Sequence, residues 1–180
     1  MFRYGKGEVH VVTTRFSVTT WAQNERWRTR RKKHGCLYGQ PRTTGARIPS
    51  GTTMIVIEMN NDVRGEKTRG RVEGLGLCVN RPLEAQLVVY GQWQYDRVFY
   101  AGSHRLDREE LPPKLVQRLE YLCFAGQGHL KRGIGFTSLP QAWISIELAR
   151  ELRRVWRNHS RTLRELKHRV VHVEEAPCCP

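Results

Sequence analysis

Residues 54–59 constrain the fold more than any other segment of the chain. They read Met-Ile-Val-Ile-Glu-Met, follow the turn-forming sequence Pro-Ser-Gly at 49–51, and precede the polar sequence Asn-Asn-Asp at 60–62. A short apolar run that is rich in β-branched residues and lies between two turn signals is typical of a buried strand. The chain is therefore expected to fold around a β core.

Four other short runs have the same character and predict further strands, at residues 9–13, 72–79, 86–90 and 97–101. Their spacing favours a small β-barrel over alternating βαβ units. Gly74 and Gly76 fall inside one run and indicate a bulge or a close approach of backbone. Residues 62–71 are charged and contain glycine, so we expect a solvent-exposed hairpin loop there.

The last third of the chain has helical signals. Asp107 is a candidate N-cap for a helix that runs through residues 112–122. Pro140 suits the first turn of another helix that continues to Trp156, and a last short helix or frayed segment is expected at residues 163–171.

These patterns predict the α+β class. Residues 1–105 are expected to form mainly the β-barrel with one early helix, and residues 106–175 a helical C-terminal part. No internal repeat or low-complexity linker separates the two, so a single domain over residues 1–180 is expected.

The charge of the chain points to a polyanionic partner. It has 31 Lys and Arg against 17 Asp and Glu, a net charge of +14, and a sequence pI near 10.2. No apolar stretch, secretory signal or lipidation signal argues for a membrane, so an intracellular protein of the cytoplasm or nucleus is expected. Five cysteines without a Cys-x-x-Cys pair predict reduced thiols, and Cys178 and Cys179 could be a metal hook, a lipid site or a frayed tail.

The early helix carries the densest charge. Thr19 or Thr20 can cap it and Gly35 supplies a stop, and between them six of the eight residues from 26 to 33 are basic: Arg26, Arg28, Arg30, Arg31, Lys32 and Lys33. Side chains of this kind neutralise phosphates, which makes binding salt-dependent. The other interpretation is a solvated helical face, but like charges this dense repel one another unless an anion lies nearby.

Aromatic residues bracket that cluster. Trp21, Trp27 and Tyr38 are candidates for stacking on an unpaired or flipped base, with Trp21 favoured as a core residue and Tyr38 as a pocket residue. A second basic candidate is the glycine-rich segment 126–135, where Lys131 and Arg132 lie among backbone N–H groups that can form a phosphate nest or an ordinary flexible connection.

A third basic set occupies the predicted C-terminal helix and is interpreted as a polar surface over a packed apolar stripe: Arg150, Arg153, Arg154, Arg157, His159 and Arg161. Catalytic signals are weaker. Glu58, Asp62 and Glu73 could cluster as ligands of a nuclease metal, although turn chemistry explains the sequence at 60–62 better. The histidines have no partner at zinc spacing. We therefore expect no catalytic residue, no metal and no cofactor.

Several short motifs resemble the PUA-like superfamily, in particular its EVE, YTH and ASCH branches. They are Phe16 with Trp21, the Gly-Cys-Leu-Tyr-Gly segment at 35–39, the Ile-Pro-Ser-Gly turn at 48–51 before the strand at 54–59, and Gly-Leu-Gly at 74–76. The resemblance covers about the first half of the chain. It implies a small β-barrel that binds RNA or DNA and holds a modified or flipped base in an aromatic pocket, here of Trp21, Trp27 or Tyr38. The whole chain also resembles uncharacterised proteins of large double-stranded DNA viruses.

The sequence thus predicts a nucleic-acid-binding protein that uses residues 26–33 and can read one extruded base. The alternative is a structural component of a virion or ribonucleoprotein particle that docks onto other proteins. A metal-dependent nuclease is the third hypothesis.

Overall fold

The computed structural model describes residues 3–4, 7–30, 35–41, 48–65, 67–84, 87–91, 97–125, 130 and 135–174. Contacts divide the chain into two compact units, Met1–Ile144 and Ser145–Pro180.

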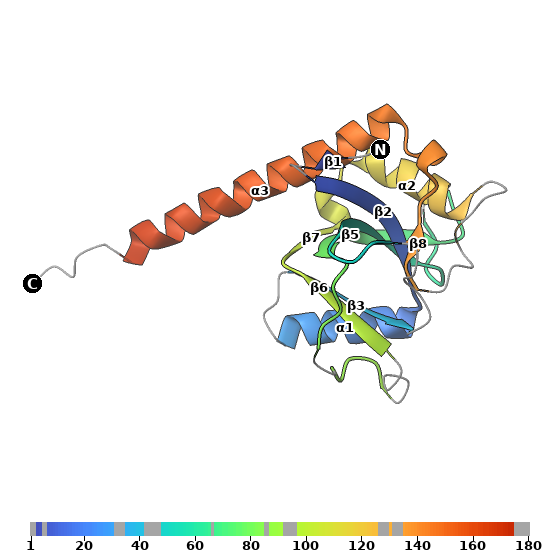
Figure 1. The fold of residues 1–180 in the computed structure, drawn as a ribbon, viewed down its shortest axis with the longest axis horizontal. Coiled ribbons are helices and arrows are strands. Elements are labelled where there is room, and N and C mark those ends of the chain that lie inside the picture. Colours follow the sequence, from blue (N-terminus) through green and yellow to red (C-terminus); the bar gives the residue numbers. More distant parts are fainter. Residues whose placement is uncertain are drawn as a thin grey trace, which may run out of the picture. The chain divides into compact units, whose positions relative to one another are not determined.

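A six-stranded sheet forms the centre of the first unit (Figure 1). Its hydrogen-bonded order is β1-β2-β4-β5-β7, and β8 pairs with β2. The strands are β1 Arg3–Tyr4, β2 Gly7–Phe16, β4 Thr53–Asn60, β5 Arg71–Val79, β7 His104–Asp107 and β8 Thr137–Ser138. Strands β2 and β4 are parallel, and the other pairings are antiparallel. A parallel pair needs a long crossover, and here α1 and β3 lie between the two strands.

A second sheet pairs β3 Cys36–Pro41 with β6 Arg97–Gly102 in antiparallel register. Strand β6 passes through Ser103 directly into β7, so one extended segment leaves this sheet and enters the larger one. The two sheets come very close at that bend, because a Cβ at Gly102 would lie 2.0 Å from the carbonyl oxygen of Leu77. One apolar cluster, which includes Val12, Met54 and Phe99, joins residues of both sheets.

Four of the five predicted strands are confirmed as β2, β4, β5 and β6, and the hairpin between β4 and β5 is confirmed as well. The predicted strand at 86–90 is wrong, because residues 87–91 form no strand and residues 85–86 lie outside the described residues. Strand β3 was not expected. The α+β class is confirmed.

Helix α2, Pro113–Phe124, lies where the sequence predicts a helix. Asp107, however, is the N-cap of a separate 3-10 turn, Arg108–Glu110, in which the Glu110 carboxylate accepts the Asp107 N–H. Pro112 is the N-cap of α2, and its buried face carries Leu115, Leu119 and Cys123. The predicted cap therefore belongs to the turn that precedes the helix.

The second unit consists mainly of α3, Ile146–Glu174. Ser145 caps it, since its hydroxyl accepts the Leu148 N–H at 3.1 Å, so the prediction that Pro140 begins this helix is wrong. The segment expected as a separate helix at 163–171 is part of α3. The apolar stripe of α3, formed by Leu148, Leu152, Val155 and Trp156, is buried. Arg150, Arg154 and Arg157 are exposed, as predicted. Within the described residues, no helix combines the length and apolarity that a membrane crossing requires.

Candidate nucleic-acid interface

Helix α1, Val18–Arg30, confirms the predicted early helix. Its cap is Ser17 rather than Thr19 or Thr20. The Ser17 hydroxyl accepts the Thr20 N–H at 3.1 Å and the Thr20 hydroxyl accepts the Ser17 N–H at 2.9 Å, which satisfies two groups at the helix start. Asp62 also accepts the Val18 N–H at 3.1 Å. A carboxylate stabilises a helix N-terminus, so the loop after β4 is joined to the start of α1.

Asn24 fixes the side of α1 that faces the protein. It is buried in the middle of the helix, and its amide donates to the carbonyl oxygen of Leu37 at 2.8 Å and to the Tyr90 hydroxyl at 2.9 Å. Its carbonyl accepts from Arg28 Nε at 3.1 Å. One side chain thus connects α1 to strand β3 and to residues 87–91.

Residues 87–91 are held from their other side by a stack of rings. Tyr90 lies parallel to Phe99 with ring centroids 6.2 Å apart, and the guanidinium of Arg97 lies 5.0 Å from the centre of the Tyr90 ring. Burial raises the pKa of Tyr90 above its ordinary value. These contacts position the segment beside α1 without any strand pairing.

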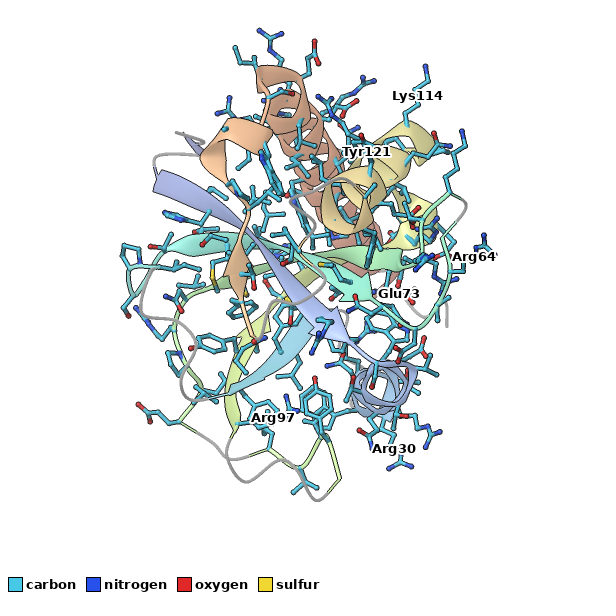
Figure 2. All side chains as sticks on the ribbon, turned by 90° about the vertical axis from the view of Figure 1, so that its right-hand side faces the viewer. Arg30, Arg64, Glu73, Arg97, Lys114 and Tyr121 are labelled. Atoms are coloured by element: carbon cyan, nitrogen blue, oxygen red, sulfur yellow. The ribbon has the colours of Figure 1, made fainter. Side chains whose placement is uncertain are left out.

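The result is a groove between α1 and residues 87–91, which we call the α1 groove. It has a volume of about 310 Å³ and is lined by Gln23, Arg26, Trp27, Arg30, Val88 and Val89. At 100° per residue, Arg26 and Arg30 lie about 40° apart on one helix face. Both arginines are exposed, Trp27 is half-buried, and Val88 is 78% exposed. Figure 2 shows Arg30 projecting outward from α1.

The electrostatics of the α1 groove favour an anion. Among the described residues, no ion pair engages Arg26 or Arg30, so their charges face the space of the groove. An aromatic face beside two guanidinium groups matches the base and the phosphate of a nucleotide. Chemically, the arrangement can bind a phosphate chain and stack one base.

Arg28 does not belong to that surface, which corrects the prediction of one continuous basic face. It lies about 160° around the helix from both Arg26 and Arg30. Its guanidinium is 5.5 Å from the centre of the Trp21 ring, and its Nε donates to Asn24. Arg28 therefore packs along the helix and stabilises it.

Trp21 is a packing residue, as the sequence favoured. Its ring meets Phe16 edge-on at 5.2 Å, and the buried guanidinium of Arg105 lies 5.1 Å from its centre. With Arg28 close to the same ring, Trp21 links α1 to an ionic cluster inside the sheet.

Tyr38 lies in that cluster and not in an open pocket, so its prediction as a base-stacking residue is corrected. Its side chain is 1% exposed, and its hydroxyl donates to Glu58 Oε1 at 2.8 Å. Burial, with Cys36 and Glu58 nearby, raises the pKa of Tyr38 well above its ordinary value. A Cβ at Gly76 would lie 1.8 Å from the Tyr38 hydroxyl, which explains why glycine occupies this position of β5.

Arg105 neutralises Glu58 in the same cluster. Its guanidinium lies 2.7 Å from Glu58 Oε2, both side chains are 2% exposed, and Asp107 takes a further ion pair. Burial would lower the pKa of Arg105, but Glu58 and Asp107 outweigh it and raise that pKa. A Cβ at Gly74 would lie 2.9 Å from the Arg105 guanidinium, so this glycine makes room for the pair.

The three carboxylates proposed as nuclease ligands are each engaged elsewhere. Glu58 pairs with Arg105, Glu73 pairs with Arg71 at 2.7 Å and accepts from Asn60 at 2.8 Å, and Asp62 binds the start of α1. The part of the chain that the structure describes holds no group of three or more potential metal ligands. The alternative in which Glu58, Asp62 and Glu73 cluster as metal ligands therefore has no support in the described residues.

Several predicted site residues lie outside the described residues, namely Arg31, Lys32, Lys33, Lys131, Arg132, Cys178 and Cys179. Two residues that shape the α1 groove were missed by sequence reasoning. Asn24 has a signal, because a polar residue at the centre of a helix that bears an apolar side needs a partner. Val88 has no such signal, because no local sequence pattern connects Val88 and Val89 to α1.

No family model, no curated protein sequence and no solved structure matches this chain, so geometry alone supports a function.

Proposed function

We propose that this protein binds nucleic acid through the α1 groove, with phosphates on Arg26 and Arg30 and an unpaired or extruded base against Trp27. The observation that carries the proposal is the convergence of two exposed guanidinium groups and one aromatic ring in a single groove. The net charge of +14 supports it, because such a chain attracts polyanions at long range.

We also infer that the two sheets are parts of one small barrel of the PUA-like kind. The bend from β6 into β7 joins one side of the two sheets. On the other side, the Gln40 amide of β3 donates to the Thr14 hydroxyl of β2 at 3.0 Å, and both residues are buried. In this arrangement α1 covers β3 and presents the groove at the outer surface of the barrel.

The test is the salt dependence of oligonucleotide binding. The double variant Arg26→Ala with Arg30→Ala should bind more weakly and should lower the magnitude of the slope of log K against log salt by about 1.4 to 1.8, since each phosphate contact contributes about 0.7 to 0.9. Arg81→Ala is the control, because Arg81 is also an exposed arginine of the first unit and lies outside the α1 groove. An unchanged slope in the double variant would remove the groove from the interface.

A different outcome would favour the other hypothesis. If the wild-type protein ignores oligonucleotides at every salt concentration and assembles with other proteins, a role as a virion or ribonucleoprotein component is supported instead. The exposed side chain of Val88 would then be the first contact to examine.

A further inference from the structure

A second groove of the first unit lies between α2 and the loop after β4, and we call it the α2 groove. It has a volume of about 520 Å³ and is lined by Lys67, Thr68, Lys114, Gln117, Arg118, Glu120, Tyr121 and Ala125. Lys114, Gln117, Arg118 and Tyr121 follow the 3.6-residue period and share one face of α2. The opposite face of the helix is the buried one.

The loop side of the α2 groove is fixed by two close approaches. A Cβ at Gly70 would lie 2.1 Å from the Phe124 ring of α2, and a Cβ at Gly65 would lie 2.9 Å from Glu120 Oε2. The Gly65 N–H also donates to the carbonyl oxygens of Thr68 and Gly70, at 3.2 Å each. Only glycine permits this packing, which places Lys67 and Thr68 beside the helix.

The chemistry of the α2 groove is that of a nucleotide site. Tyr121 is a large aromatic ring that is 64% exposed, and Lys67 and Lys114 are exposed cations on either side of the groove. The carboxylate in the lining, Glu120, is buried and already paired with Arg108 and with the Val72 N–H. Among the described residues no ion pair engages Lys67 or Lys114, so the groove offers a stacking surface and positive charge.

The loop that forms the α2 groove also reaches α1. Asp62 binds the N-terminus of α1, and eight residues later Gly70 contacts α2. The exposed cations Arg64, Lys67 and Arg69 lie along this connection. In both views α1 and α2 lie at opposite ends of the first unit, and in Figure 2 Arg64 projects on the same side as Arg30 and Lys114, between them.

We propose that the α2 groove holds an unpaired nucleotide, with its base stacked on Tyr121 and its phosphate on Lys67 and Lys114, and that this nucleotide belongs to a single strand that continues past Arg64 to the α1 groove. This proposal rests on the proposed function, because the strand must also occupy the α1 groove. It deepens that function by making the ligand single-stranded and by giving the ligand a second site. The paired bases of a duplex present no free face to Tyr121.

The experiment compares a labelled single-stranded oligonucleotide with the same sequence in a duplex. Tyr121→Ala should weaken single-strand binding by about 5- to 150-fold, which is the range for loss of one stacked base, and should change duplex binding less than twofold. Tyr121→Phe should restore most of the lost affinity, because the ring is what stacks. Lys114→Ala should lower the magnitude of the single-strand salt slope by about 0.7, whereas Arg81→Ala, the control in the same unit, should not.

The outcomes separate the two proposals. If Tyr121→Ala leaves single-strand affinity unchanged while Arg26→Ala with Arg30→Ala removes it, the α2 groove is overturned and the proposed function stands. The wild-type protein could instead bind no strand but bind adenosine monophosphate, with a change in tyrosine fluorescence that Tyr121→Phe removes. In that case the proposal of a bound strand is overturned, and the α2 groove is a site for free nucleotides. If neither probe binds, both proposals are overturned.

Discussion

The first unit places an arginine near a tryptophan in two settings. Inside the sheet, Arg105 lies 5.1 Å from the Trp21 ring and pairs with Glu58, and both charged side chains are 2% exposed. At the α1 groove, Arg30 lies beside Trp27 in the open, and within the described residues no carboxylate pairs with it. The same residue types therefore stabilise the core in one place and line an open groove in the other. What separates them is the presence of a buried counter-ion.

The sharpest way to test this contrast is to remove each arginine in turn. Arg105→Met should lower the free energy of unfolding by about 3–5 kcal/mol, because it leaves the Glu58 carboxylate buried without its partner. Arg30→Met should change that free energy by less than about 0.5 kcal/mol, as is usual for an exposed surface position. Urea unfolding of the two variants measures both effects.

A second variant shows whether the unpaired charge is the cause. Adding Glu58→Gln to Arg105→Met removes the charge and keeps an oxygen that accepts from the Tyr38 hydroxyl. Most of the lost stability should return. If the double variant is as unstable as Arg105→Met alone, the pair matters through packing and not through its charge.

Substitution of the two tryptophans tests the same contrast between ligand binding and stability. Trp27→Leu should weaken oligonucleotide binding by about 1–3 kcal/mol through loss of base stacking, while leucine keeps an apolar group against the core cluster. Trp21→Leu should mainly lower the free energy of unfolding, because it removes a ring that packs on Phe16, Arg28 and Arg105. Titration of each variant with one oligonucleotide, together with its urea midpoint, separates the effects. Equal loss of affinity in both variants at equal stability would contradict the assignment.

Asn24 is expected to contribute both to the stability of the fold and to the shape of the α1 groove. Asn24→Ala leaves the carbonyl of Leu37 and the hydroxyl of Tyr90 without their donor, and a buried unsatisfied group costs about 1–3 kcal/mol. It also releases residues 87–91 from α1, so oligonucleotide affinity should fall together with stability. Thr29→Ala, at an exposed position on the same helix, is the control and should change neither quantity.

Most strands of the buried sheets could be predicted from the sequence, because a run of apolar residues indicates a buried segment. The run at 54–59 became β4, and glycines at 74 and 76 became close approaches. Strand β3 was missed because its sequence, Cys-Leu-Tyr-Gly-Gln-Pro, contains a glycine and a proline and gains its pairing from β6, about 60 residues away. The bend at Ser103 depends on the same long-range pairing.

The α1 groove was predictable only in part. Helix arithmetic alone separates Arg28 from Arg26 and Arg30, so the prediction of one basic face could have been refined without a structure. The other side of the groove, residues 87–91, could not be predicted from the sequence, because Asn24 and Tyr90 are in contact although they lie 66 residues apart. Likewise, nothing local distinguishes Tyr38, whose buried ring packs near Phe16 and Phe136, from an aromatic residue at the surface.

The smallest expected effect concerns the alkaline stability of the buried region. Burial, and then the nearby Glu120, raise the pKa of the Cys123 thiol above its ordinary value of 9.0, so the folded state keeps a proton that the unfolded state loses above about pH 9. The unfolded state then binds fewer protons, and the free energy of unfolding falls as pH rises, by up to about 1.4 kcal/mol per pH unit for this group. Below pH 9 the thiol is protonated in both states and contributes no slope.

Cys123→Ala should therefore flatten the decline of stability between pH 9.5 and 11 by about 1 kcal/mol per pH unit, measured by urea unfolding at each pH. Val116→Ala is the matched control, since it removes a buried side chain from the same helix without removing a titrating group. It should shift the free energy of unfolding by the same amount at every pH. If the two variants decline in parallel above pH 9, the alkaline sensitivity arises from other buried groups, of which Tyr38 in the Glu58 cluster has a pKa raised in the same direction. If Tyr38 is the group responsible, a Tyr38→Phe variant flattens the decline above pH 10. Cys78, whose pKa is raised by a hydrogen bond with Cys36 and by burial, and Tyr90, whose pKa is raised by burial, are further candidates.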